Sequence, residues 1–506
     1  YRQLGDLKQA NEWGLRFLEN WEANQEHVRG DDELNQSILS TNIGGMFRSV
    51  ATTLAMAGEI ESGLEVCERG RGRATVDLLE NKADLPHKRL MAADIRSIAI
   101  RLNTVIVVYS FSRIDTRKPN QRQTDRKQDF EEQHLFIWVI PPSLDQPISF
   151  HDIHNEHAAV LPRLTLAARR EIGLLGGGYT LLDGRNFESE ESFESPDDNQ
   201  PHPDNSLATL FNLLIKPIDD SLPKEQDPTT VTFVPDQFMF LVPWAALLDQ
   251  NTKQQTNRFL IEKHAFSIVP CVRLLELLPA TIPITKSSAS LIVGGPTNPF
   301  FPNLPGAKKE AEQIASMMEN TSLLVGEHAA KKAILDGFAG KQLIHFAGHG
   351  VRNVRPNLPE GSLVLHDTLH GALITSSVDG KDLANSFLVA TEIEGSQLMP
   401  GSIVVLSGCN TGLGRLSSDG VGGLARAFLG SGASAVVMSL WAISDATTEE
   451  LMVRFYRQLM KGGQSPVHAL RNSMLGMIIE HRNTPHLWAG FVVFGTSLHQ
   501  PIHTLS

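Results

Sequence analysis

Two apolar runs end in residues that could do chemistry together. LIHFAGHG (343–350) ends in His349 and Gly350, and SIVVLSGCN (402–410) contains Cys409, one of three cysteines in the chain. A cysteine attacks as its thiolate, and a free thiol is only slightly ionised near pH 7. An imidazole within reach can take the proton and later give it to a leaving group. The residue types are therefore those of a cysteine–histidine dyad.

Glycines flank both residues. Gly350 follows the histidine, and Gly408 precedes the cysteine. Glycine allows a backbone to come close to a substrate, and backbone N–H groups can stabilise the oxyanion of a tetrahedral intermediate. We expect the N–H groups of Gly350 and Cys409 to form an oxyanion hole. The alternative for Cys409 is a buried core thiol in an inactive protease fold.

The elements that would position this pair alternate between apolar strands and helices. We predict strands over 231–236, 290–295, 341–350, 402–410 and 433–441, and helices over 207–218, 305–320 and 447–461. Continuous Val, Ile and Leu runs between helices indicate an α/β fold with a largely parallel sheet covered on both faces. Functional groups of such sheets gather at the carboxyl ends of strands. His349, Cys409 and Asp445 should therefore meet at one rim.

Helices dominate residues 1–90. Leu4-Gly5-Asp6 and Ala57-Gly58-Glu59 each precede a helical pattern, and a Gly-acid turn between paired helices is typical of tetratricopeptide arrays. We expect a tetratricopeptide-like tail of an array that continues upstream of Tyr1. The alternative is a plain helical hairpin packed on the next domain.

Two strands, 103–111 and 134–140, follow the helical segment. We expect a disordered loop at 113–133, which is basic, and another at 175–206, which is rich in Gly, Ser and acidic residues. We predict three parts: the helical tail (1–90), an N-terminal protease-like part (91–285) and a catalytic part (286–500).

Several motifs resemble one family. HFAGHG, LSGCNTG, GVGGLARAFLGSGASAVVMSLWAISD and HLWAGFVVFG resemble the CHAT domain, a caspase-like family often joined to tetratricopeptide repeats and in the same clan as separase. VPDQFMFLVPWAALLD, LPGAKKEAEQIA and ERGRGRATVDLL are similar to the same family, in the expected order. The resemblance implies a caspase-like, largely parallel sheet flanked by helices.

The resemblance also implies roles for single residues. His349 would be the general base and Cys409 the nucleophile, with the histidine upstream as in the clan. Asp445 matches an acidic residue that, in separase-like relatives, helps form the S1 pocket and selects a basic P1 residue. The alternative is that Asp445 caps the next helix, where Thr447 and Glu450 would form a capping box. The cysteine context is not QACxG, so the aspartate specificity of caspases does not transfer.

The remaining histidines and cysteines carry simpler predictions. His345 and His349 are four residues apart on a strand, not a helix, so we expect no zinc site and a hydrogen-bonded core role for His345. Cys67 and Cys271 should be core thiols. GGLARAFLGSG lacks the lysine of a phosphate-binding loop, and we expect no cofactor.

Composition restricts the class of protein. The net charge of −12 argues against general binding of nucleic acid or anionic membranes. Three cysteines in 506 residues suit a reducing compartment, the cytoplasm. We predict a cysteine endopeptidase that acts on protein substrates and is regulated by a protein partner on the helical segment. The alternative is a non-catalytic adaptor with a protease-like fold.

Overall fold

One continuous sheet forms the centre of the computed structural model. The structure describes residues 6–24, 33–115, 131–154, 156–172, 179–180, 186–187, 205–224, 227–251, 256–299, 301–351, 362–367, 384–408, 416–417, 420–421, 423–441, 443, 445–461, 463–496 and 498–499. Over these residues the sheet has eleven strands, in the order β11-β10-β12-β16-β19-β20-β9-β6-β1-β2-β3. Most neighbours are parallel. The antiparallel pairs are β19 with β20, β1 with β2 and β2 with β3.

The strands of the C-terminal half are short, and all but the edge strand β11 are almost wholly buried. They are β10 (Ser290–Gly294), β11 (Thr321–Val325), β12 (Leu343–Gly348), β16 (Ile403–Gly408), β19 (Ala435–Ser439) and β20 (Phe491–Gly495). Every residue of β10, β19 and β20 is buried. Helices on both faces explain why these strands are continuously apolar rather than alternating. The predicted largely parallel α/β sheet is confirmed.

The strands of the N-terminal half are β1 (Thr104–Asp115), β2 (Glu131–Ile140), β3 (Ser149–His154), β6 (Thr230–Val234) and β9 (Phe266–Ile268). The hairpin of β1 and β2 is longer than predicted, because its pairing runs from Ile106 with Ile140 to Asp115 with Glu131. Residues 113–115 and 131–133 thus belong to strands, since the antiparallel ladder pairs their backbone groups. The rest of the predicted loop, 116–130, lies outside the described residues.

Most of the predicted 175–206 loop also lies outside the described residues. Within it the structure has the strand pair β4 (Tyr179–Thr180) and β5 (Asn186–Phe187), and α8 (Ser206–Leu214) begins at its end. Smaller elements of the chain are α6 (Glu156–Ala159), α7 (Leu161–Glu171), β7 (Leu248–Asn251), β8 (Thr256–Phe259), α9 (Leu260–Lys263), α10 (Val272–Leu277), β17 (Leu416–Ser417) and β18 (Gly420–Val421).

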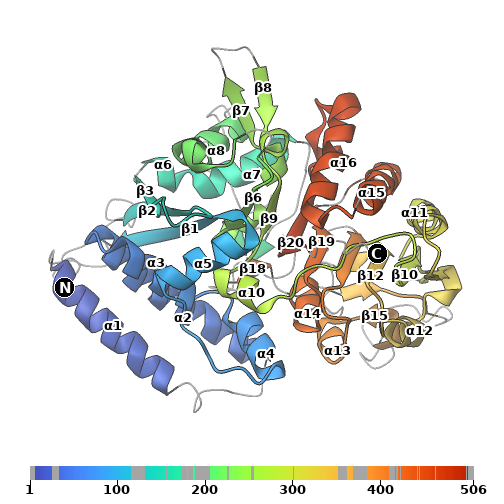
Figure 1. Ribbon diagram of the computed structural model, residues 1–506, viewed down its shortest axis with the longest axis horizontal. Helices are drawn as coiled ribbons and strands as arrows, with labels where there is room; N and C mark the ends of the chain where they lie inside the picture. The colour runs from blue at the N-terminus through green and yellow to red at the C-terminus, as the bar shows by residue number, and fades with distance from the viewer. Residues whose placement is uncertain are drawn as a thin grey trace.

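Successive side chains of β1 point alternately into two hydrophobic cores, one on each face of the sheet. Ile106 and Val108 pack with the N-terminal helices, while Val105 and Val107 pack with α7 and α8 on the opposite face. This is the period of two expected of a strand with both faces covered. Figure 1 shows α7 and α8 on one side of the sheet and the N-terminal helices on the other.

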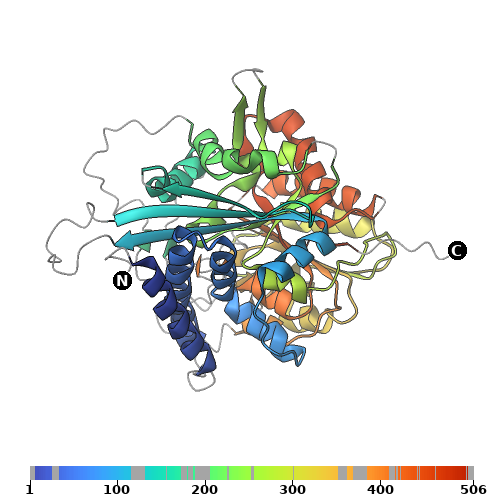
Figure 2. The same ribbon diagram turned by 60° about the vertical axis from the view of Figure 1, so that its left-hand side comes forward.

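The N-terminal helices are α1 (Leu7–Ala23), α2 (Glu33–Met56), α3 (Ile60–Arg69), α4 (Arg73–Lys82) and α5 (Ala92–Leu102). Asp6 caps α1 by accepting a hydrogen bond from the Gln9 N–H at 3.0 Å. Gly58 has φ +84° in the turn between α2 and α3, a conformation that favours glycine. The predicted Gly-acid turn therefore occurs there. Of these helices, α2 and α5 lie against the long strands β1 and β2 (Figure 2).

Helices of the C-terminal half also form two layers. They are α11 (Pro305–Ser316), α15 (Asp445–Met460) and α16 (Pro466–His481) on one face, and α12 (Lys331–Asp336), α13 (Ala390–Glu394) and α14 (Leu424–Gly430) on the other (Figure 1). Because α15 begins at Asp445, Thr447 lies within its first turn. The predicted Thr447–Glu450 capping box is therefore wrong, since an N-cap residue must precede the helical turn. None of the described helices is long and apolar enough to cross a membrane.

Candidate active site

The rim of the sheet brings the two motifs of interest together. β12 and β16 are adjacent and parallel, and their register pairs Gly348 with Gly408. These glycines directly precede His349 and Cys409 in the sequence. β19, the next strand, lies parallel to β16. The carboxyl ends of the three strands therefore share one edge, as predicted from their order. Cys409 itself lies outside the described residues.

His349 is half-buried and held by a backbone carbonyl. Its Nε2 lies 2.8 Å from the carbonyl oxygen of Pro302, and its ring centroid lies 5.5 Å from that of Phe301. A carbonyl can only accept, so Nε2 must carry the proton and donate it. In the neutral imidazole the lone pair then lies on Nδ1. The contact thus selects the tautomer in which Nδ1 can act as a base.

Gly350 begins a small sheet next to the rim. This sheet consists of β13 (Gly350–Val351), β14 (Ser362–Val364) and β15 (Phe387–Leu388). The Val364 N–H donates to the carbonyl of His349 at 3.0 Å, and Gly350 lies opposite Leu363. Because hydrogen-bonded and non-hydrogen-bonded pairs alternate in antiparallel ladders, the Gly350–Leu363 pair is the non-hydrogen-bonded one. The Gly350 N–H therefore points away from β14.

The end of β16 is tied to the end of β19. Ser439, the last residue of β19, donates a hydrogen bond from Oγ to the carbonyl of Gly408. This contact holds the backbone immediately before Cys409. Asp445 is the first residue of α15, within the turn where the helix dipole favours negative charge. Its side chain lies outside the described part, so both predictions for it stay open.

A pocket opens beside these strand ends. Gly348, Ser407, Gly408 and Ser439 line it from the sheet, and its volume is about 420 Å³ including the space open to solvent. Buried Ser407 has no hydrogen-bond partner for Oγ among the described residues. The pocket therefore lies at the strand ends that directly precede His349 and Cys409 in the sequence.

His345 belongs to a buried polar cluster below this pocket. The side chains of His345 and Glu310 are 0% and 1% exposed. The hydroxyl of Tyr456 lies 3.0 Å from Nδ1 of His345, so the predicted hydrogen-bonded core role is confirmed. Nε2 lies 3.0 Å from Oε1 of Glu310, but in the described structure neither atom has a partner in hydrogen-bonding geometry. The two atoms are in ion-pair range with poor alignment.

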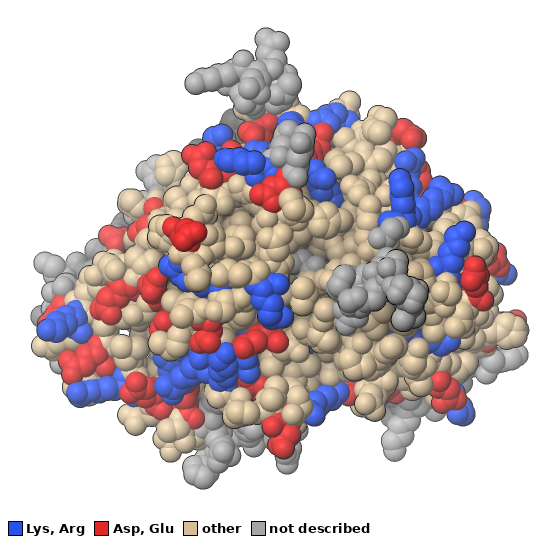
Figure 3. Space-filling view, viewed as in Figure 1, with Lys and Arg blue, Asp and Glu red and all other residues tan. Residues whose placement is uncertain are grey.

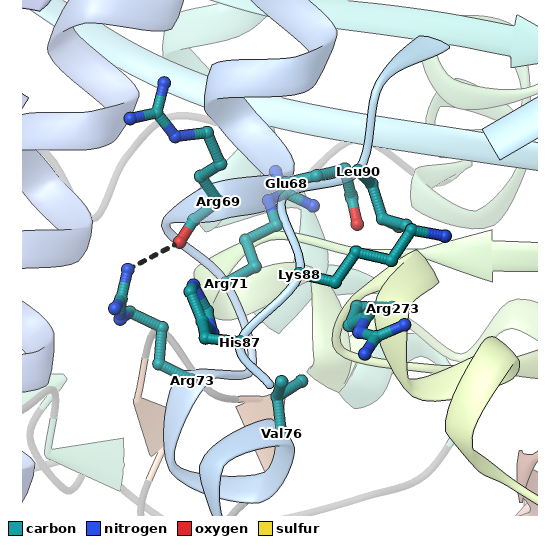
Figure 4. Close-up of a pocket in the computed structure, with 9 residues that line it drawn as sticks. All are labelled: Glu68, Arg69, Arg71, Arg73, Val76, His87, Lys88, Leu90 and Arg273. Atoms are coloured by element: carbon teal, nitrogen blue, oxygen red, sulfur yellow. Dashed lines mark hydrogen bonds between the residues drawn. The ribbon is translucent and has the colours of Figure 1, made fainter. Parts of the chain in front are cut away.

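A second cavity lies where the helical segment meets the sheet. Figure 4 shows the nine residues that line it, six of them basic: Arg69, Arg71, Arg73, His87, Lys88 and Arg273. The predicted motif ERGRGRATVDLL supplies the first three. Such a cluster could suggest an anion site. However, acidic side chains already neutralise it.

Glu22 neutralises two of these basic residues, Arg69 and Arg73. It is 7% exposed and lies 2.6 Å from Arg69, 2.6 Å from Arg89 and 3.8 Å from Arg73. Arg273 lies 2.7 Å from the buried Glu80. On the face shown in Figure 3, acidic and basic side chains are likewise intermixed at the helical end of the molecule. We interpret this cavity as part of a structural ion-pair network.

Cysteine and metal predictions can be compared with the described residues. Cys67 and Cys271 are buried, as predicted, and burial raises the pKa of the Cys67 thiol. In the described part of the chain, the one group of three potential metal ligands is Asp77, Glu80 and His87. Glu80 already pairs with Arg273, so the three side chains of this group are not all available to bind a metal ion.

The comparison with known proteins gives the family. Residues 204–496 match the model of the CHAT domain, which is more than half of the chain. The chain belongs to the CHAT family. Human tetratricopeptide repeat protein 28 is 25% identical over 335 residues, which are 58% of this chain and 13% of that protein. The mouse protein of the same name is 26% identical over 59% of this chain and 14% of its own length.

A solved structure agrees with the fold. Separase in the separase–securin complex of Saccharomyces cerevisiae superposes with a TM-score of 0.53 at 9% identity, over 97% of this chain and 37% of that chain. At this identity the likeness shows the fold alone. The caspase-like sheet flanked by helices, predicted from the motifs, is therefore confirmed for this CHAT-family chain.

Three features of the site were absent from the sequence predictions. These are the Pro302 carbonyl on His349, the hydrogen bond from Ser439 to Gly408, and the buried Glu310 beside His345. The proline-rich PTNPFFPNLPG (296–306) offered a signal for a shaped loop, but not for its partner. Glu310 lies within LPGAKKEAEQIA, where its apolar neighbours Ala307, Ala311 and Ile314 indicated that this face is buried.

Proposed function

We propose that this CHAT-family protein is a cysteine endopeptidase that uses Cys409 and His349. The observation that carries the proposal is the register of β12 and β16, which pairs the residues preceding the histidine and the cysteine. The tautomer selected at His349 supports it, because Nδ1 is then the nitrogen free to accept a proton.

The proposed reaction has two halves. His349 Nδ1 takes the thiol proton of Cys409, and the thiolate attacks the carbonyl carbon of the scissile peptide, forming a C–S bond. The C–N bond then breaks as His349 gives the proton to the leaving amine. Water, activated by the same imidazole, hydrolyses the thioester, releasing the carboxylate product and restoring the thiol.

The N–H groups of Gly350 and Cys409 would stabilise the oxyanion of both tetrahedral intermediates. The orientation of the Gly350 N–H, away from β14, leaves it available for this role. Asp445 would favour a basic P1 residue, since a carboxylate pairs well with a guanidinium. A reducing compartment, the cytoplasm, would keep the nucleophile as a thiol.

Regulation would come through the helical segment, by a protein activator or inhibitor. We divide the chain functionally into this segment (1–90), a protease-like part (91–285) and a catalytic part (286–500). The two later parts share one sheet, so they would act as one body.

A non-catalytic adaptor is the second candidate. Trp13 and Phe17 on α1 are 54% and 47% exposed, and large exposed aromatic residues on one helix favour a protein contact. In an adaptor, the helical segment would carry the function and the CHAT domain would serve as a platform.

Cleavage of a mixed peptide library by wild type and by Cys409→Ala tests the first candidate. We expect cleavage by wild type and at least a ~1,000-fold loss in the variant, since removal of a nucleophile abolishes covalent catalysis. His349→Ala should lose activity comparably. Equal cleavage by wild type and Cys409→Ala would contradict the proposal.

Thiol reactivity separates a latent enzyme from an adaptor. An accessible, activated Cys409 should react with iodoacetamide faster than an ordinary cysteine. Buried Cys67 and Cys271 provide internal references in the same folded chain, read by peptide mass mapping. A Cys409 that reacts no faster than these two would favour the adaptor.

A further inference from the structure

The outer edge of the N-terminal half carries a group of polar side chains on one face of β2 and β3. In the described sheet β3 is the last strand, next to β2 (Figure 1), and its register places His154 directly opposite His134. Glu132 precedes His134 by two residues, and Asp152 precedes His154 by two. Because side chains alternate between the two faces of a strand, all four project from the same face. Each of the four carries an atom that could bind a metal ion.

Asp152 fixes the orientation of the His134 ring. Nδ1 of His134 lies 2.9 and 3.2 Å from the two carboxylate oxygens of Asp152. An ionised carboxylate can only accept a hydrogen bond, so Nδ1 carries the proton and donates it. The ring also stacks on Phe136, with the two centroids 5.3 Å apart. In the neutral imidazole the lone pair therefore lies on Nε2.

Nε2 of His134 is buried and has no hydrogen-bond partner among the residues that the structure describes. His134 as a whole is 7% exposed. A carboxylate oxygen of Glu132 lies 3.8 Å from Nε2, beyond hydrogen-bond distance. The ring centroid of His154 lies 5.9 Å from that of His134, and the two rings are tilted by 30°. A buried polar atom without a partner calls for an explanation, and here a carboxylate and a second imidazole lie beside it.

This arrangement is that of a metal-binding histidine. Such a histidine offers one ring nitrogen to the ion and donates its other N–H to a carboxylate, which fixes the tautomer. Zinc accepts histidine nitrogens and carboxylate oxygens as ligands, at about 2.0–2.2 Å, so two ligands of one tetrahedral ion lie roughly 3.4 Å apart. Nε2 of His134 and the Glu132 oxygen are 3.8 Å apart, and the side chain of Glu132 is 51% exposed. A small movement of Glu132 would therefore bring both atoms to one ion.

We infer that Glu132, His134 and His154 form a binding site for a divalent transition metal ion such as zinc, with Asp152 orienting His134. The side chain of His154 is exposed, so its ring can turn towards the ion and supply the third ligand. Water would complete the tetrahedral set. The ion would join the edge strand β3 to β2 through side chains, in addition to the backbone ladder. The inference does not depend on the proposed peptidase activity.

Binding of Zn²⁺ to the full chain tests the site without requiring catalysis. Cys409→Ala serves as the parent, because it lacks the thiol that the proposed function places at the rim, and Cys67 and Cys271 are buried. After treatment with EDTA and dialysis, calorimetric titration should show Zn²⁺ binding to the parent. Loss of an outer partner of a metal ligand typically costs ~10–100-fold in affinity, so loss of a ligand in His154→Ala or Glu132→Gln should cost at least about tenfold. Both side chains are exposed, so neither change disturbs the core.

Matched variants separate this site from other histidines. Asp152→Asn keeps the three ligands but weakens the hold on Nδ1, so the affinity should fall by about tenfold. His151→Ala removes a histidine from the opposite face of β3 and should leave Zn²⁺ binding unchanged. His87→Ala removes a member of the other group of potential ligands, at α4, and should also leave the binding unchanged.

Absence of Zn²⁺ binding to the parent chain would overturn the inference, and His134 would then be an imidazolium between two carboxylates. An affinity that is unchanged in His154→Ala and Glu132→Gln, or that is lost in His87→Ala, would overturn it as well. Amide hydrogen exchange gives a second readout. Zn²⁺ should slow exchange in β3 but not in β11, the strand at the opposite edge of the described sheet. Equal effects at the two edges would contradict a site on β2 and β3.

Discussion

The imidazole of His349 is oriented by the backbone carbonyl of Pro302. A carbonyl cannot titrate, so this contact keeps the same tautomer at any pH at which the ring is neutral. Glu310 differs, because it is a buried acidic side chain whose Oε1 lies 3.0 Å from Nε2 of His345. At the scale of residues, therefore, the region combines a backbone group that orients one histidine with a buried side chain beside another.

His264 gives a prediction for pH at this scale. Burial, followed by the charge of Lys263, lowers its pKa from 6.5 to about 4. The unfolded chain then binds one proton more than the folded chain between these values, so stability is complete above pH 6.5 and falls as pH drops towards 4. The loss should reach about 3 kcal/mol.

Urea unfolding of wild type and His264→Gln at pH 7, 5.5 and 4.5 measures the contribution of His264 to the pH dependence of stability. The variant should show a shallower fall of the unfolding free energy on acidification. Some slope should remain, since burial also lowers the pKa of His468 and His499. Identical slopes for the two chains would contradict the assignment to His264.

Among the elements, α11 packs unusually close to β10. A Cβ added at Gly294 would lie 2.2 Å from Cβ of Ala311 and 2.8 Å from the carbonyl oxygen of Ala307. Only glycine fits between the strand and the helix without movement. This close approach seats α11 against the rim and so places Glu310 at the pocket.

Gly294→Ala should therefore displace α11. We expect a loss of about 1–3 kcal/mol in unfolding free energy from overpacking. Gly45→Ala is a matched control, because a Cβ there meets nothing within 4 Å and Gly45 lies inside α2. That variant should gain about 0.5–1 kcal/mol from helix propensity. Equal stability of the two variants in urea unfolding would refute the close-packing argument.

Across the whole molecule, one sheet and a set of polar contacts join the helical segment to the C-terminal half. Glu22 of α1 receives Arg69 and Arg73 from the α3–α4 region. From the end of α4, Lys82 donates to the carbonyl of Glu394 in α13 at 2.7 Å. A change at α1 thus has a set of contacts leading towards α13, the helix that precedes β16 in the chain. The proposed regulation through the helical segment would act along this path.

Glu22→Gln tests the strength of the connection. Removing one member of a buried ion-pair network leaves its partners uncompensated, so we expect a loss of about 3 kcal/mol and faster amide hydrogen exchange in α1. Glu12→Gln, on the exposed side of the same helix and paired only with Arg16 among the described contacts, should change stability by less than about 0.5 kcal/mol. Similar exchange rates in both variants would argue against a clamping role for Glu22.

The order of strands and helices in the C-terminal half followed from the sequence alone. Short apolar runs such as SLIVG and AVVMS, bounded by helical patterns, predict buried strands. Parallel strands separated by helices have their carboxyl ends at one rim of the sheet. That local reasoning also predicted that His349, Cys409 and Asp445 lie at one edge, and the structure pairs Gly348 with Gly408, the residues before the first two. The lengths of β1 and β2 were not predicted, because the polar ends of these strands are stabilised by backbone pairing across the hairpin, which the sequence pattern does not show.

Contacts between distant segments could be decided only by the tertiary structure. Pro302 and His349 are brought together by the loop after β10, and Glu310 reaches His345 and the pocket because Gly294 lets α11 lie close to the sheet. The start of α15 was likewise misjudged by two residues, since cap residues are chosen by backbone geometry as well as by side-chain type. Periodicity in a sequence reports which face of an element is buried, but not which atom it meets there. Pairing across the sheet and between layers supplies that information.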